Sequence, residues 1–348
     1  MVAISQTHEE TRPFTARRWL HGGHVQTLAS FLIQRQFHVS APEERLIEVA
    51  PGVKVLCHCH WQADRARALT VIIVHGLEGS SESQYMLGIT EKALAAGMNA
   101  IRYNQRNCGG TDALAPVLYH SGLSNDVAAV AREVIARDGV SRLALVGFSM
   151  GGNIVLKLGG EWGTQGPPQF RAVAACCPAI DLATSADTLH EPANRIYERY
   201  FLWALRRRML QKACLFPEHF DVGRLRGIRS LREFDDKVTA YYCGFTGADD
   251  YYDRASAAHV VERIAVPAMV LYAANDPFIR ITAETRRKIS SNPNITFVET
   301  ADGGHCAFIG APMSPASRSG DGAGNGRDGR YNDGYWAEHE IVNFLRRL

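Results

Sequence analysis

Short apolar runs alternate with amphipathic stretches through the first half of the chain. The runs are rich in Val, Ile, Leu and Ala, which is typical of parallel strands buried on both faces. We expect strands at Leu69–Val74, Met98–Tyr103, Leu143–Val146 and Ala172–Cys177. The stretches between them keep helical spacing and predict helices at about 85–96, from Ser121 or Ser124 to about 137, and from about 153. This alternation implies right-handed crossovers and a parallel sheet with helices on both faces.

The sheet extends beyond this block in both directions along the chain. On the N-terminal side, Leu46–Ala50 and Val53–Trp61 resemble two strands joined by a Pro-Gly turn. On the C-terminal side, apolar runs predict strands at Ala268–Ala273 and Ile295–Glu299, and a closing helix covers about Tyr335 to Leu348. The whole therefore predicts an α/β fold with a mostly parallel central sheet flanked by helices.

Three segments depart from the alternating pattern. The apolar residues in positions 1 to about 44 show no helical or strand periodicity, and this segment is expected to form an N-terminal arm that packs over the core. Residues from about 181 to 265 are rich in aromatic and helix-forming positions, which predicts a helical cap inserted over the strand ends. The Ser-, Gly-, Asp- and Asn-rich stretch Pro312–Arg330 is expected to be a mobile surface loop. We expect residues 1–348 to form a single domain that includes the arm and the cap.

Two features of the predicted cap bear on its role. Its apolar helix face either packs onto the core or lines an acyl pocket, and the pattern leaves both open. The run Arg206–Arg208 is expected near a helix C-terminus, where cations are favourable, and not at a lipid headgroup.

Composition excludes several classes of protein. The 348 residues are 46% hydrophobic and 21% charged, with a formal net charge of +2, which favours neither a nucleic-acid partner nor a strongly electrostatic surface. No apolar run approaches the roughly 20 residues that span a bilayer, and the first residues do not resemble a signal peptide. The eight cysteines lack zinc-type or redox-type spacing, so a reducing, cytoplasmic setting without a disulfide framework is expected. We expect no cofactor.

A metal site at Cys57–His60 is the main alternative that the residue types raise. Cysteine and histidine both bind zinc, and the four residues are consecutive in the sequence Cys-His-Cys-His. In a strand, however, the two cysteines face one side and the two histidines the other. We therefore expect no metal here.

The segment Leu143–Asn153 contains the strongest catalytic signal. A buried apolar run leads into Gly147–Gly151, a G-x-S-x-G sequence, and a helix follows. Strand, sharp turn and helix in this order are typical of a nucleophile elbow, in which the serine hydroxyl projects from the end of the sheet. Ser149 is the predicted nucleophile.

A serine nucleophile needs a base and an orienting carboxylate. His305 follows the last predicted strand on a glycine-rich turn, and Asp276 follows the strand before it. The order Ser149, Asp276, His305 is that of the α/β-hydrolases. The competing acids are Asp249 and Asp250, which lie in the insertion, and Asp302, which is too close to His305 along the chain.

Acyl transfer also needs hydrogen-bond donors for the oxyanion. The N–H of Met150, directly after the nucleophile, is one candidate. The loop after Val74 carries His75-Gly76-Leu77, and the Leu77 N–H is the other. A serine in place of aspartate at the elbow disfavours hydrolases that use a carboxylate nucleophile.

Several stretches resemble the YheT-like family of α/β-hydrolases, whose eukaryotic relatives include the embryogenesis-associated and ABHD-type proteins. The residues that carry the resemblance are Gly23–Thr27, His75–Ser80, Arg106–Gly110, Tyr119–Gly122, Gly147–Asn153, Leu231–Asp236, Ala248–Tyr252, Asn275–Phe278 and Gly303–His305. The resemblance covers about residues 17–348. Asn275 stands where relatives often carry a second aspartate, and the membrane anchor of some eukaryotic relatives is not recognisable.

The resemblance implies a serine hydrolase that cleaves carboxylic esters, with some relatives acting on phospholipids or transferring acyl groups to alcohols. We therefore expect a carboxylesterase acting on small acyl esters of short to medium chain length. An acyltransferase with the same acyl-enzyme, a phospholipase-type activity and a non-catalytic binding protein remain alternatives. The sequence leaves the oligomeric state open.

Overall fold

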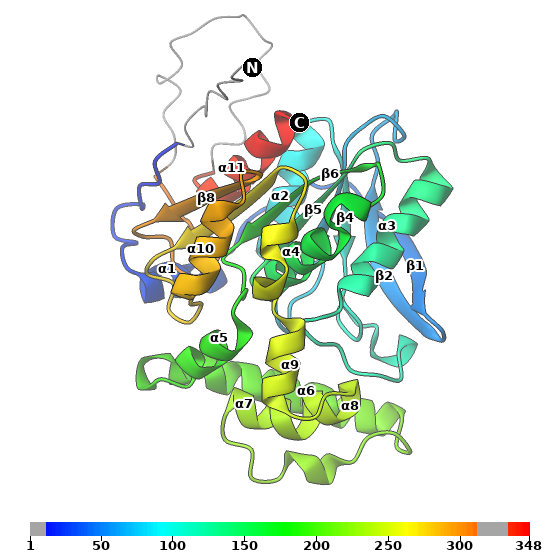
Figure 1. The fold of residues 1–348 in the computed structure, drawn as a ribbon, viewed down its shortest axis with the longest axis vertical. Helices are drawn as coiled ribbons and strands as arrows, with labels where there is room; N and C mark the ends of the chain where they lie inside the picture. The colour runs from blue at the N-terminus through cyan, green and yellow to red at the C-terminus, as the bar shows by residue number, and fades with distance from the viewer. Residues whose placement is uncertain (1–11, 312–332) are drawn as a thin grey trace, which may run out of the picture.

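The computed structural model describes residues 12–311 and 333–348. Within these residues an eight-stranded sheet forms the centre of the molecule, in the order β1-β2-β4-β3-β5-β6-β7-β8 (Figure 1). The strands are β1 (Glu43–Ala50), β2 (Val53–His60), β3 (Thr70–Val74), β4 (Asn99–Tyr103), β5 (Leu143–Phe148), β6 (Phe170–Cys176), β7 (Ala268–Ala273) and β8 (Ile295–Thr300). The hairpin β1–β2 is antiparallel and joins β4 antiparallel, whereas all strands from β4 to β8 run parallel. The predicted α/β fold class is confirmed.

Helices cover both faces of the sheet, as the apolar runs predicted. The helices are α2 (Gln84–Ala95) and α11 (Trp336–Arg346) on one face, and α3 (Ser124–Asp138), α4 (Met150–Trp162) and α10 (Ala283–Ser291) on the other. Successive β3 residues alternate between the two layers: Val71 and Ile73 pack with α2 and α11, whereas Ile72 and Val74 pack with α3 and α4. Because a strand alternates its side chains, a continuous apolar run is what this double burial requires.

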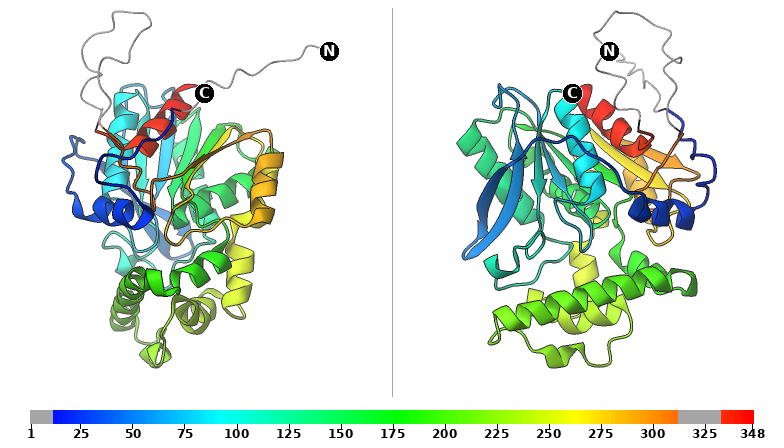
Figure 2. Two further views of the ribbon diagram at one scale, coloured as in Figure 1. Left: turned by 90° about the vertical axis from the view of Figure 1, so that its left-hand side faces the viewer. Right: turned by 180° about the vertical axis from the view of Figure 1, so that it is seen from behind.

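Between β6 and β7 the chain leaves the sheet and forms a helical layer at the carboxyl ends of the parallel strands (Figures 1 and 2). We call residues 181–265 the cap. Its α- and π-helices are α5 (Leu182–Leu189), α6 (Arg195–Leu215), α7 (Leu231–Phe234), a π-helix (Asp235–Ala240), α8 (Tyr241–Cys243) and α9 (Ala248–Ala255). The expectation for Arg206–Arg208 is wrong, because α6 continues to Leu215 and the three arginines lie in its interior.

The N-terminal residues lie beside the opposite edge of the sheet from the β1–β2 hairpin (Figure 2). Helix α1 (Gly23–Leu32) follows a bridge in which Ala16 pairs with Gly310. The predicted loop Pro312–Arg330 lies outside the described residues. In the part of the chain that the structure describes, no helix is long and apolar enough to cross a membrane.

Candidate active site

Ser149 occupies a sharp turn between β5 and α4. Its φ of 55° and ψ of −120° lie outside the regions that ordinary residues favour, as expected for a strained elbow. The flanking glycines make the turn sterically feasible. A Cβ on Gly151 would overlap the carbonyl oxygen of Val74 on the neighbouring strand, and a Cβ on Gly147 would overlap the Gly151 backbone.

The structure brings Asp276 and His305 together. Asp276 follows β7, His305 follows β8, and the His305 Nδ1 atom lies 2.8 Å from Asp276 Oδ2. The Asp276 side chain is buried, and its Oδ1 atom accepts hydrogen bonds from the N–H groups of Phe278 and Ile279. These contacts fix the carboxylate, so that it can hold the imidazole with its Nε2 atom available for proton transfer.

The competing acids lie elsewhere. Asp302 accepts hydrogen bonds from Asn275 and from the N–H groups of Gly22 and Gly303, and it makes none with His305. Asp249 on α9 is exposed and pairs with Arg232. Among the predicted acids, Asp276 alone contacts the histidine.

No hydrogen bond joins Ser149 Oγ to the His305 ring in this structure. Catalytic hydrogen bonds are often long before a substrate binds and tighten afterwards. Phe278 packs against the His305 ring, with 4.2 Å between the ring centroids, and also lines the pocket at Ser149. Phe278 therefore contacts the histidine and borders the same pocket as the serine, and both residues follow the carboxyl ends of parallel strands.

The two predicted oxyanion donors flank Ser149. Neither the Leu77 N–H nor the Met150 N–H donates to an acceptor among the described residues. The Leu77 loop approaches the serine closely, because a Cβ on Gly76 would lie 3.1 Å from Ser149 Cβ. Free N–H groups beside a nucleophile are the donors that a tetrahedral oxyanion needs.

His75 stabilises this loop from within. Its buried ring contacts the Gly76 carbonyl oxygen through Nδ1, at 2.8 Å, and accepts from the Gln105 N–H through Nε2. Burial lowers the pKa of His75 to about 4, so the ring is neutral at pH 7 with its proton on Nδ1. His75 is therefore a structural residue of the loop.

A pocket lies between Ser149 and the cap, with roughly 740 Å³ of empty space when the open solvent at its mouth is included. Apolar side chains form most of its wall, and those from the cap include Phe201, Leu205 and Leu231. Leu205 also packs with Met209, one turn further along α6, in a hydrophobic cluster formed mostly by cap residues. Phe201 packs against the main hydrophobic core. The apolar face of α6 therefore lines the pocket and also packs against apolar side chains of the cap and the core.

Helix α1 contacts the loops that carry Asp276 and His305, a relationship that the sequence reasoning missed. The Thr27 Oγ1 atom accepts from the His305 N–H at 2.9 Å. Gln26 is fully buried and bonds to both the N–H and the carbonyl oxygen of Ile309. A Cβ on Gly23 would overlap the Asn275 carbonyl oxygen. The arm is therefore part of the site's framework, and the Gly23–Thr27 stretch was the available signal.

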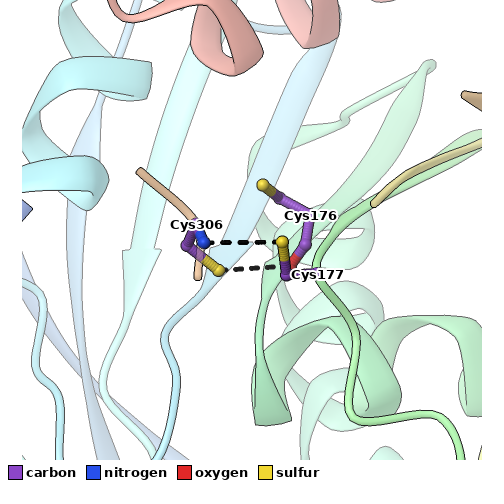
Figure 3. A group of neighbouring side chains, drawn as sticks. All are labelled: Cys176, Cys177 and Cys306. Carbon is purple, nitrogen blue, oxygen red and sulfur yellow. Dashed lines mark hydrogen bonds between the residues drawn. The ribbon is translucent and has the colours of Figure 1, made fainter. Parts of the chain in front are cut away.

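Two consecutive cysteines, Cys176 and Cys177, meet a third that is distant in sequence, Cys306, beside His305 (Figure 3). The sulfur atoms of Cys176, Cys177 and Cys306 lie within 4.8 Å of one another, and Cys306 Sγ is 4.0 Å from His305 Nε2. Sulfur ligands could in principle hold a soft metal ion, but they bind as thiolates. Burial raises the pKa of all three thiols well above its usual value, which favours the protonated form.

Comparisons with known proteins identify the family and the fold. Residues 70–312 match the family model described as the alpha/beta hydrolase fold. The chain is 30% identical to the putative esterase YheT of Escherichia coli, over 86% of this chain and 88% of that protein. It is 28% identical to the mouse phospholipase ABHD3, over 72% of this chain and 60% of the relative. An esterase of Pyrococcus furiosus shares the fold with a TM-score of 0.55 at 15% identity, over 91% of this chain and 95% of that one. The chain therefore belongs to the α/β-hydrolase fold family, in the YheT-like group that the sequence motifs indicated.

Proposed function

We propose that the protein is a serine hydrolase that cleaves carboxylic esters through a Ser149–His305–Asp276 triad. The contact of 2.8 Å between His305 Nδ1 and the buried Asp276 carboxylate carries the proposal, because it engages Nδ1 and makes Nε2 the nitrogen that can take a proton from a nucleophile. Ser149 on its strained turn is the nucleophile at the same edge of the sheet. The names of two relatives, an esterase and a phospholipase, also support ester chemistry.

The reaction follows from the positions of these groups. His305 removes the Ser149 proton as the hydroxyl oxygen attacks the ester carbonyl carbon, and the Leu77 and Met150 N–H groups bind the resulting oxyanion. The protonated histidine, stabilised by Asp276, then donates its proton to the leaving alcohol. Water, deprotonated by His305, attacks the acyl-enzyme, and collapse of the second tetrahedral intermediate releases the acid and regenerates Ser149.

The cap is proposed to set the size of the acyl group. Residues 181–265 cover the strand ends, and their apolar side chains close the pocket above Ser149. A mostly apolar wall favours an acyl chain over a charged group. Short- to medium-chain esters are therefore the proposed substrates.

The test is hydrolysis of p-nitrophenyl esters of graded chain length by the wild type and by Ser149→Ala. Loss of the nucleophile is expected to lower kcat by about 10,000-fold or more, because only oxyanion stabilisation and binding remain. Cys306→Ala is the matched control, since its thiol lies 4.0 Å from His305 Nε2 and its raised pKa makes it a poor nucleophile. Equal turnover by the wild type and Ser149→Ala would refute the assignment. Products are also analysed with added alcohol, and an ester product formed at alcohol concentrations well below that of water would favour acyl transfer over hydrolysis.

A further inference from the structure

Asp235 is a buried acid in the wall of the pocket at Ser149, and the proposed triad does not use it. Its side chain comes from the first residue of the π-helix in the cap and is 8% exposed. Asp235 is the only charged residue among those lining the pocket. π-Helical turns often occur at functional sites, and an acid in a mostly apolar pocket has a desolvation cost that needs a reason.

Hydrogen bonds from the protein use only part of the capacity of this carboxyl group. Oδ1 accepts from Thr239 Oγ1 at 2.7 Å, and Oδ2 accepts from Tyr252 OH at 2.7 Å. A carboxylate offers about four acceptor sites. No lysine or arginine in the described residues forms an ion pair with it, and the nearby Arg232 pairs with Asp187 and Asp249 instead. Acceptor capacity therefore remains on a group that borders the pocket.

His120 supplies an unused donor to the same pocket. Its Nδ1 atom accepts from the Gly122 N–H at 3.1 Å, and burial lowers the pKa of the ring to about 3. The ring is therefore neutral and carries its proton on Nε2. No described residue accepts a hydrogen bond from this Nε2–H. Packed rings connect His120 to Asp235, because His120 contacts Tyr251, Tyr251 contacts Tyr252, and Tyr252 donates to Asp235.

An acceptor and a donor together match a hydroxyl group, which donates one hydrogen bond and accepts another. A cation would satisfy Asp235 but would face the His120 donor, and a carboxylate would be repelled by the ionised acid. The remaining wall near these residues offers Ser121, Thr239 and Tyr251, all uncharged. We propose that Asp235 and His120 form a hydroxyl-binding subsite, and that the preferred substrate is an ester whose otherwise apolar body carries a free hydroxyl group.

This inference rests on the proposed function for its assignment of the substrate as an ester. The hydroxyl could lie on the acyl chain or on the alcohol, because the pocket includes Ser149 and accommodates groups near the reacting bond. Both sources present the same chemistry to the subsite. A set of matched esters distinguishes them.

The experiment measures binding by isothermal titration calorimetry with Ser149→Ala, which is expected to leave the esters intact. The ligands are propyl octanoate, 3-hydroxypropyl octanoate and propyl esters of positional hydroxyoctanoic acids. One hydroxylated series is expected to bind at least about tenfold more tightly than propyl octanoate, because a methylene would leave both polar groups unpaired. The series that gains affinity identifies the source of the hydroxyl. Equal affinities throughout would overturn the proposal.

Second substitutions in the Ser149→Ala background assign the effect to the subsite. Asp235→Asn replaces an acceptor with a donor, and His120→Asn keeps an acceptor for the Gly122 N–H while removing the Nε2–H donor. Each is expected to reduce the hydroxyl preference, measured as the ratio of Kd values, by about tenfold. Asp249→Asn removes an exposed acid of the same cap and is the matched control, with an unchanged ratio. A ratio that survives both Asp235→Asn and His120→Asn would refute the subsite.

Turnover of the same esters by the wild type separates this inference from the proposed function. If no ester is hydrolysed, the proposed activity fails, and the Kd ratios still decide the subsite. If the esters are hydrolysed without any hydroxyl preference in binding, the activity stands and the subsite is wrong.

Discussion

Arg208 of the cap forms an ion pair with Glu78 of the loop after β3, 130 residues away in the sequence. The guanidinium donates from Nε and Nη2 to the two carboxylate oxygens, at 2.7 and 3.0 Å, and both side chains are largely buried. Arg208 also contacts the Asn107 carbonyl oxygen and Asp112. Glu78 directly follows Leu77, so this ion pair ties helix α6 to a proposed oxyanion donor. The cap therefore helps to position the loop that it covers.

Arg208→Met tests this coupling. Removing one partner leaves a buried carboxylate unpaired, which is expected to destabilise the fold by about 3–5 kcal/mol and to lower kcat through the displaced Leu77 N–H. Urea unfolding and ester turnover measure the two effects. Arg207→Met, which changes an exposed arginine of the same helix, is the control. The double variant Arg208→Met/Glu78→Gln should recover part of the stability, and a double variant no more stable than Arg208→Met would argue against the pair.

Asp276→Asn tests the proposed orienting acid. An amide in place of the carboxylate favours the wrong imidazole tautomer and does not stabilise the imidazolium, so kcat is expected to fall by about 10,000-fold. Steady-state kinetics on p-nitrophenyl esters measure the loss. Asp302→Asn is the matched control, because Asp302 also follows the carboxyl end of a parallel strand and accepts from Asn275, without a hydrogen bond to His305. A larger kcat loss in Asp302→Asn than in Asp276→Asn would reverse the assignment.

Thr27→Val tests whether the N-terminal arm positions His305. The substitution removes the acceptor for the His305 N–H, and an unsatisfied buried N–H costs about 1–3 kcal/mol. We expect kcat to fall by about tenfold or more with little change in KM, since the histidine and not the substrate pocket is disturbed. Thr27→Ser keeps the hydroxyl and should restore kcat. Loss of stability without a kcat effect in Thr27→Val would indicate a purely structural contact.

The buried carboxyl group of Asp235 is expected to make the stability of the fold depend on pH. Burial raises its pKa to about 6, above its value of about 3.8 in the unfolded chain. Between these values the folded state binds more protons, so stability falls as pH rises. Relative to Asp235→Asn, the wild type should lose up to about 3 kcal/mol between pH 3.8 and 7. Urea unfolding of both proteins across this range measures the difference, and a difference independent of pH would contradict the shifted pKa.

Much of the fold followed from local patterns. The β7 strand has the predicted bounds, Ala268–Ala273, and the strand ending at Val74 begins one residue later than expected. Apolar runs predict buried strands well because a parallel sheet covered on both faces accepts few polar side chains. The glycine spacing around Ser149 was equally informative, since a sharp strand-to-helix turn leaves no room for side chains at Gly147 and Gly151.

The sequence by itself thus determined the sheet, the elbow and the chain order of the candidate triad, whose catalytic roles remain predictions. Tertiary structure alone decided which distant groups meet. It placed Thr27 against His305, Arg208 against Glu78, and Asp235 in the wall at Ser149. Periodicity reports which face of an element is buried, because burial repeats with the geometry of the backbone. Periodicity does not show which residue of another element packs against the buried face. That residue depends on how the arm and the cap fold back over the strand ends.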